Sequence, residues 1–166
     1  MPGIFGNQAT GDLFNLSKDY CMGSLYTCPE VGVAESISVF FHATAGGGKN
    51  FKAGLYKKSD KSWVANTGVG VSVAGTWVTL DITDGGVLEA TDYFIVVWLE
   101  EAEVTCDTYD GTSAYDSEVY GNPWPNPWDE TAWGTNEFPF YCTYSVPSGA
   151  APMSSPAAAL IGAGVV

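Results

Sequence analysis

The chain has 166 residues, 46% of them hydrophobic and 15% charged, which suits one folded domain with a sizeable core and excludes an intrinsically disordered chain. Its formal net charge is −13, it contains no arginine, and five of its six lysines lie between Lys49 and Lys61. A protein with this much negative charge repels phosphate groups, and without arginine it lacks the guanidinium donors that usually bind them. The sequence therefore argues against nucleic-acid binding.

The first residues show no regular strand pattern. Residues 1–19 mix glycine, asparagine and glutamine with scattered apolar side chains. No basic and apolar leader precedes Ile4, so the sequence shows no secretory signal. We predict that residues 1–19 form an N-terminal arm outside the domain, because such a segment frays when alone. Ile4 and Phe5 would then be apolar anchors on a neighbouring subunit.

Strand-like runs begin near residue 20 and follow one another at short spacing. An early run covers residues 19–27, and residues 36–43 then alternate between apolar and polar side chains. This alternation places Ile37, Val39 and Phe41 on one face of a strand. The next runs, separated by turns rich in glycine, serine or aspartate, are 51–57, 62–66, 69–73 and 77–82.

Residues 93–99 are apolar on both faces, which is typical of a central and fully buried strand. The closing run covers residues 138–144. No segment shows a convincing helical period with a cap at its start. Eight or nine short strands therefore predict an all-β protein, and more finely a two-sheet jelly-roll β-sandwich over residues 20–144.

Residues 109–133 carry three of the six tryptophans together with Pro123, Pro125 and Pro127. These prolines exclude a helix or a regular central strand, so we predict a long ordered loop, a feature that is usually functional. Its rings would either stack on sugars, or cover the sandwich and pack against a neighbouring subunit. The candidate glycan- or partner-binding residues are Tyr109, Tyr115, Tyr120, Trp124, Trp128, Trp133, Asn122, Asn126 and Asp129.

The four cysteines permit three pairings. Cys21 and Cys28 bracket a stretch that a tight loop could close, and Cys106 and Cys142 flank the aromatic segment. We predict the bridges Cys21–Cys28 and Cys106–Cys142, with free buried thiols as the alternative. No cysteine pair has the spacing of a zinc site.

Acidic side chains gather in and near the aromatic segment. A glycosidase needs two carboxylates across a cleft, but acids on one loop are more simply a solvated surface, so we expect no enzymatic activity. We expect no cofactor either, although hard oxygen ligands would suit calcium. The calcium candidates are Asp107, Asp110, Asp116 and Glu118.

Residues 145–166 form a C-terminal tail rich in alanine, glycine, proline and serine. Its apolar part is shorter than the ~20 residues that cross a bilayer, so we expect no membrane span. We predict that this tail, like the N-terminal arm, lies on neighbouring copies of the chain. Its apolar anchors would be Leu160, Ile161 and Val165.

Six motifs occur in order along the chain, at 35–39, 52–56, 75–80, 88–96, 115–120 and 140–144. Together they resemble a diffuse group of carbohydrate-binding-module-like jelly-roll domains, found in secreted microbial proteins and in structural proteins of phages and archaeal viruses. The similarity runs from about Tyr20 to Tyr144, and no catalytic residues come with it.

The sequence therefore predicts a non-enzymatic structural protein at an extracellular or virion surface. The leading expectation is a virion component, such as a capsid decoration, turret or fibre protein, that binds copies of itself and other structural proteins through its tails. The alternative is a secreted carbohydrate-binding or adhesion module that uses the aromatic loop to bind glycans.

Overall fold

The computed structural model describes residues 2–107 and 111–147, which contain no helix and confirm the all-β prediction. The strands of this part are β1 (Pro2–Gly6), β2 (Asp12–Leu16), β3 (Tyr20–Thr27), β4 (Gly32–Phe41), β5 (Asn50–Lys57), β6 (Trp63–Thr67), β7 (Gly70–Val71), β8 (Thr76–Gly85), β9 (Val87–Leu88), β10 (Asp92–Leu99), β11 (Glu103–Asp107), β12 (Ser113–Ser117), β13 (Ala132–Gly134) and β14 (Phe140–Ser145).

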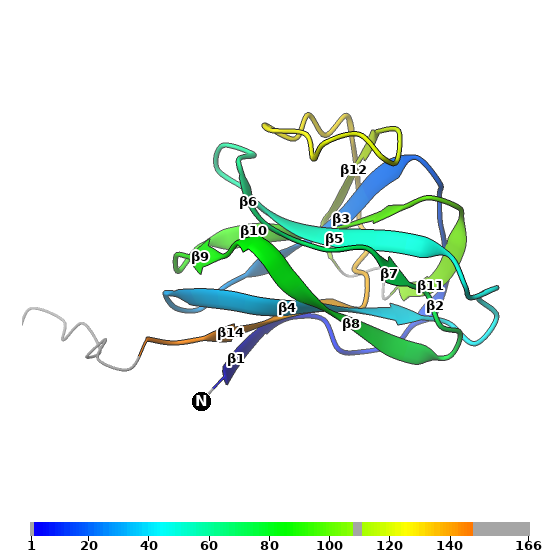
Figure 1. The fold of residues 1–166 in the computed structure, drawn as a ribbon, viewed down its shortest axis with the longest axis horizontal. Helices are drawn as coiled ribbons and strands as arrows, with labels where there is room; N and C mark the ends of the chain where they lie inside the picture. Colours follow the sequence, from blue (N-terminus) through cyan, green and yellow to red (C-terminus); the bar gives the residue numbers. More distant parts are fainter. Residues whose placement is uncertain (1, 108–110, 148–166) are drawn as a thin grey trace, which may run out of the picture.

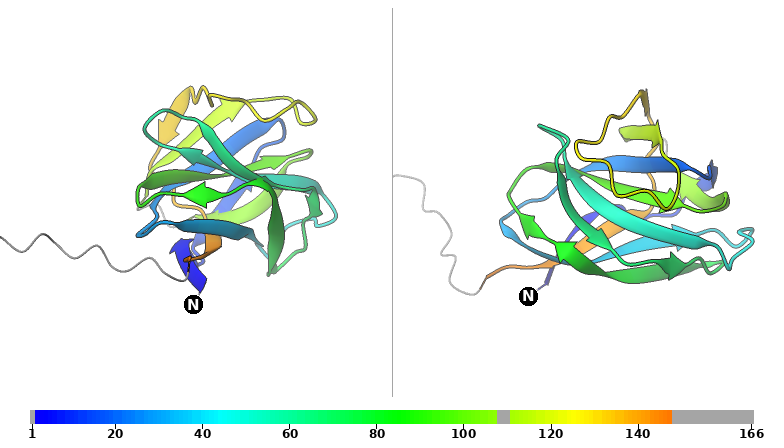
Figure 2. Two further views of the ribbon diagram at one scale, coloured as in Figure 1. Left: turned by 60° about the vertical axis from the view of Figure 1, so that its left-hand side comes forward. Right: turned by 45° about the horizontal axis from the view of Figure 1, so that its top comes forward.

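Twelve strands form one antiparallel sheet in the order β1-β14-β4-β8-β6-β5-β10-β3-β12-β13, with β7 beside β5 and β9 beside β4. β11 and β2 form a separate two-stranded sheet. The large sheet curls around its own core into a half-barrel (Figures 1 and 2). It is continuous because β8 pairs with β4 through residues 76–81 and with β6 through residues 82–85. The two layers expected of a sandwich are thus joined by β8.

Gly85 makes this joining strand possible. Its φ is +76°, and a Cβ atom on it would lie 2.0 Å from the carbonyl oxygen of Val64. Only glycine tolerates both the left-handed backbone and so close an approach of a neighbouring strand. Gly85 thus lets the end of β8 lie against β6.

β10 is the central strand that the sequence predicts. It lies between β5 and β3, and all residues from Tyr93 to Leu99 are buried. Tyr93, Ile95, Val97 and Leu99 face the main core, which also contains Phe41, Phe51 and Phe140 among others. The residues that alternate with them belong to a second cluster on the opposite face, namely Phe94, Val96 and Trp98.

The N-terminal segment packs on its own domain. β1 pairs with β14, and Phe5 is only 4% exposed, with its ring centroid 6.0 Å from those of Tyr93 and Tyr144. Phe5, expected to anchor in a neighbouring subunit, therefore fills the core of this chain. Ile4 is 49% exposed on the same strand. The tail anchors Leu160, Ile161 and Val165 lie outside the described residues.

The two predicted disulfide bridges are not formed. Cys21, Cys28 and Cys142 are free, buried thiols. Cys21 lies near the start of β3, and Cys28 directly follows its last residue. Seven extended residues span about 23 Å, whereas Cα atoms must be within about 7 Å to be bridged. They also belong to opposite faces of the sheet.

Cys142 is the second correction. It lies on β14 in the main core, where burial raises the pKa of its thiol. Because this thiol is free, the bridge to Cys106 is absent. Cys106 belongs to β11, where its partner across the ladder is Leu13 of β2, so the two cysteines are on different sheets.

Candidate functional site

The aromatic segment is partly strand and partly lid. Its ends form β12 and β13, and residues 118–131 between them lie over the outer face of the sheet (Figure 1). Trp128 is 1% exposed, and its ring centroid lies 5.3 Å from that of Phe94 and 5.4 Å from that of Tyr56. Trp128 therefore belongs to the second cluster and offers no face to a sugar. The name lid is used below for residues 118–131.

Lys52 of β5 attaches the lid to the sheet. Its Nζ lies 3.9 Å from the ring centroid of Trp98, 5.1 Å from Trp124 and 5.3 Å from Tyr120. The same ammonium donates to the carbonyl oxygen of Asn122 at 3.2 Å. Cation–π contacts of this kind contribute about 0.5–2 kcal/mol each. Tyr120 and Trp124 therefore make their contacts within the domain.

Lys61 holds the lid at a second point. It forms an ion pair with Glu130, and its carbonyl oxygen accepts a hydrogen bond from the backbone of Trp128 at 3.0 Å. Its Nζ also lies 4.8 Å from the ring centroid of Trp133. Burial lowers the pKa of Lys61, as it does that of Lys52.

The remaining predicted residues do not form one platform. Tyr115 is 37% exposed and Trp133 is 52% exposed. Tyr115 pairs with Ala132 across β12 and β13, whereas Trp133 pairs with Ala114. Because alternate residues of a strand point to opposite faces, the two rings lie on opposite sides of the sheet. Asn122, Asn126 and Asp129 are exposed on the lid, and Tyr109 lies outside the described residues.

Tyr115 opens onto a groove of about 410 Å³, called here the edge groove. None of the residues that line it is charged. Phe14, Tyr20 and Tyr115 are aromatic lining residues, and Trp133 also belongs to the lining although its ring points to the other face of the sheet. The lining residues are Phe14, Asn15, Ser17, Tyr20, Met22, Tyr115, Trp133, Gly134 and Asn136.

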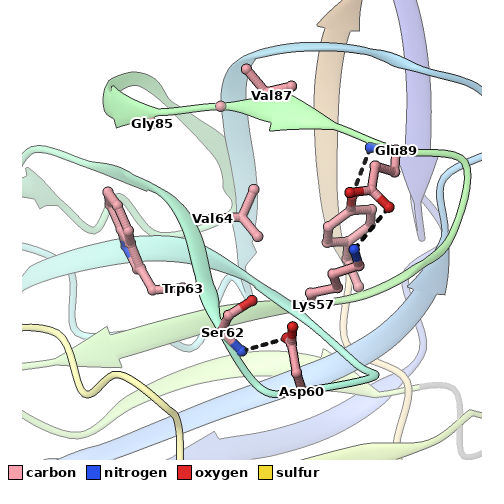
Figure 3. A pocket seen from close by; sticks show the side chains of 10 residues that line it. Lys57, Asp60, Ser62, Trp63, Val64, Gly85, Val87 and Glu89 are labelled. Carbon is pink, nitrogen blue, oxygen red and sulfur yellow. Dashed lines mark hydrogen bonds and ion pairs between the residues drawn. The ribbon is translucent and has the colours of Figure 1, made fainter.

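A second concave site of about 480 Å³, called here the Trp63 pocket, lies between β5, β6 and the end of β8 (Figure 3). Trp63 and Val64 are successive residues of β6, so their side chains point to opposite sides of this strand. Trp63 packs against the second cluster, whereas Lys57 and Glu89 lie on the side of Val64. The remaining lining residues are Asp60, Ser62, Val64, Gly85, Gly86, Val87 and Tyr93.

Hydrogen bonds fix the polar groups of the Trp63 pocket. Lys57 Nζ donates to Glu89 Oε2 at 2.8 Å, and the backbone N–H of Glu89 donates to the hydroxyl of Tyr93 at 2.8 Å. The Glu89 carboxylate holds the pKa of Lys57 above its usual value. On the floor, hydrogen bonds from Ser62 to the Asp60 carboxylate lower the pKa of that carboxyl.

The lid also positions the indole of this pocket. The backbone N–H of Trp63 donates to Asn126 Oδ1 at 3.1 Å, so the first residue of β6 is tied to the lid. The sequence analysis assigned Trp63 to a strand and did not select it as a binding residue. An indole directly after a turn rich in lysine and serine was the one available signal.

Of the calcium candidates, only Asp116 and Glu118 have described side chains. The described residues contain no group of three or more histidine, cysteine, aspartate or glutamate side chains able to hold a metal. Asp116 is nearly buried, and its Oδ1 accepts from the N–H of Ser117. The side chain of Asp107 and all of Asp110 lie outside the part of the chain that the structure describes.

Among the described residues, no helix is long and apolar enough to cross a membrane.

No family model matches this sequence, and no curated protein is significantly similar to it.

Proposed function

We propose that this protein is a non-catalytic binding module that takes one ring of a neutral saccharide in the Trp63 pocket. The observation that carries the proposal is that one concave site is lined both by Trp63 and by the ion pair of Lys57 and Glu89. Binding sites commonly combine an apolar wall with a few fixed polar groups.

The chemistry of each wall matches one part of a pyranose ring. The C–H face of a sugar stacks on an indole, which Trp63 supplies. Lys57 carries three N–H donors, of which Glu89 takes one, so the ammonium can also donate to a sugar hydroxyl. The carboxylates of Asp60 and Glu89 can accept from neighbouring hydroxyls. A net charge of −13 disfavours an acidic sugar.

The state of Asp60 supports binding rather than catalysis. A glycosidase needs one carboxyl with a raised pKa to protonate the leaving group. Hydrogen bonds from Ser62 instead lower the pKa of Asp60, so this carboxyl is an ionised acceptor at neutral pH. As part of this proposal, we classify the fold more finely as a jelly roll that resembles carbohydrate-binding modules.

Replacing Trp63 by alanine is expected to weaken saccharide binding at least tenfold, because the stacking wall is lost. A glycan array would identify the ligand, and titration calorimetry would then measure the dissociation constant. Trp133→Ala is the matched control, since it removes an exposed indole outside this pocket. The proposal fails if no neutral glycan binds, or if Trp63→Ala binds as well as the unchanged protein.

Assembly with other copies is a second candidate function, consistent with a virion surface component. An exposed apolar patch favours it, formed by Val33 (43% exposed), Val87 (75%) and Ile4 (49%). Val33 pairs with Val87 of β9 and with Ser145 of β14, and β14 is the neighbour of β1. The patch thus lies beside the end of the large sheet, where exposed apolar area often marks an interface.

If the patch joins copies of the chain, the double variant Val33→Lys and Val87→Lys should have the mass of a monomer in light scattering, whereas the unchanged protein has a multiple of it. Lysines would bring like charges together in a symmetric interface. Val69→Lys, at another exposed valine (63%), should leave the mass unchanged. A monomeric unchanged protein at high concentration would remove the support for assembly.

A further inference from the structure

The edge groove lies where two strand edges meet. Its lining includes Phe14 and Asn15 of β2 and also Trp133 and Gly134 of β13. In the described part of the chain β2 pairs with β11 alone, and β13, the last strand of the large sheet, pairs with β12 alone. The groove is therefore flanked by strands that each have one edge without a strand partner. Such edges can accept a further extended segment.

The interior of the groove suits an apolar side chain. Tyr20 and Tyr115 meet edge to face, with centroids 6.2 Å apart, and Phe14 packs on Phe138 at 4.9 Å. Met22 completes this wall. Tyrosine and methionine are enriched in protein interfaces, and methionine adapts its shape to what it binds. The volume of about 410 Å³ accommodates one large side chain with part of its backbone.

Several residues close to the lining along the chain are acidic. Asp12 lies on β2, Asp19 directly precedes Tyr20, and Glu137 directly follows Asn136. Lys18 is the one lysine in this region, and it already pairs with Asp19 at 3.6 Å. An uncharged groove between acidic flanks favours a segment that is apolar at its centre and basic on both sides.

We infer that the edge groove docks an extended segment of a different protein, with one apolar side chain in the groove and lysine or arginine on either side. Its backbone would lie along β2 and extend the two-stranded sheet. A second copy of this chain does not fit, because it contains no arginine and four of its other lysines are paired within the fold. Those pairs are Lys49–Glu101, Lys57–Glu89, Lys58–Asp92 and Lys61–Glu130.

The test uses fluorescein-labelled heptapeptides with lysine at both ends, one variable residue at the centre and threonine at the remaining positions. Fluorescence polarisation should show saturable binding when the central residue is leucine or phenylalanine, and no binding when it is aspartate. Glutamate in place of the terminal lysines should weaken binding at least tenfold. Added salt should weaken the lysine peptide, because the flanking charges are exposed.

Tyr115→Ala should abolish binding of the leucine peptide, whereas Tyr141→Ala, at a half-buried tyrosine of β14 outside the groove, should not. Equal thermal midpoints of both variants would exclude misfolding. Trp63→Ala should leave peptide binding unchanged, so this inference and the saccharide proposal can fail separately. Absence of peptide binding, retained binding by Tyr115→Ala, or displacement of the peptide by a neutral oligosaccharide would each overturn the inference.

Discussion

Replacing Trp128 by alanine is expected to lower the free energy of unfolding by about 3–5 kcal/mol, the usual cost of truncating a buried tryptophan. Trp128 is 1% exposed and makes an edge-to-face contact with Phe94 of the central strand. Its loss would leave a cavity between the lid and the sheet. Since small domains are stable by only about 5–15 kcal/mol, this loss is easily measured by urea unfolding.

Two matched variants separate the contribution of the lid from that of a tryptophan as such. Trp133→Ala removes an indole that is 52% exposed and should cost less than about 1 kcal/mol. Trp128→Phe should cost less than the alanine variant, because the indole N–H of Trp128 is buried and has no hydrogen-bond partner among the described residues. Equal costs for Trp128→Ala and Trp133→Ala would contradict a structural role for the lid.

The central part of the fold is predictable from sequence because its signals are local. Residues 93–99 are apolar on both faces, and β10 has a covered surface on each side. Residues 36–43 alternate, and Ile37, Val39 and Phe41 face the core. In both strands the pattern alone reports which faces are buried.

The missed strands have no such pattern. β1, β12 and β13 are short and rich in glycine, serine or alanine, and each is a strand because an existing edge accepts it. Phe5 therefore looked like part of a free arm, although the edge of β14 holds it in the core. The disulfide predictions were wrong for a related reason. Spacing along the chain does not show that Cys21 and Cys28 are separated by the length of an extended strand and belong to opposite faces of the sheet.

The candidate sites were predictable only in part. Tyr115 and Trp133 lie in the segment selected for its aromatic residues, but their exposure depends on strands far away in the chain. Trp124 and Trp128 are enclosed by Tyr56, Phe94 and Trp98, about 30–70 positions earlier. The Trp63 pocket was not predicted, since Lys57, Trp63 and Glu89 come from three separate elements.

Replacing Glu103 is expected to have a second large effect on the stability of the fold. Glu103 is a carboxylate only 4% exposed, and it binds the glycine-rich turn between β4 and β5. Its Oε1 accepts from the N–H of Gly46 at 2.8 Å, and its Oε2 accepts from the N–H of Gly47 at 2.9 Å and from the hydroxyl of Ser72 at 2.9 Å. Hydrogen bonds to an ionised acceptor are roughly twice as strong as neutral ones.

Glu103→Gln should therefore lower the free energy of unfolding by about 3 kcal/mol, even though the two side chains have nearly the same shape. A glutamine amide has one acceptor oxygen, so its NH₂ group would face the backbone N–H of Gly46 or Gly47 and leave that donor without its acceptor. Gly47 has a φ of +67°, a left-handed backbone conformation, so the turn cannot easily adopt another shape.

Glu101→Gln is the control, because Glu101 is exposed and pairs with Lys49 at the surface. Urea unfolding should show a lower midpoint for Glu103→Gln and an unchanged midpoint for Glu101→Gln, and hydrogen exchange should show faster exchange at Gly46 and Gly47 in the first variant alone. An unchanged midpoint for Glu103→Gln would mean that the buried carboxylate does not stabilise this turn.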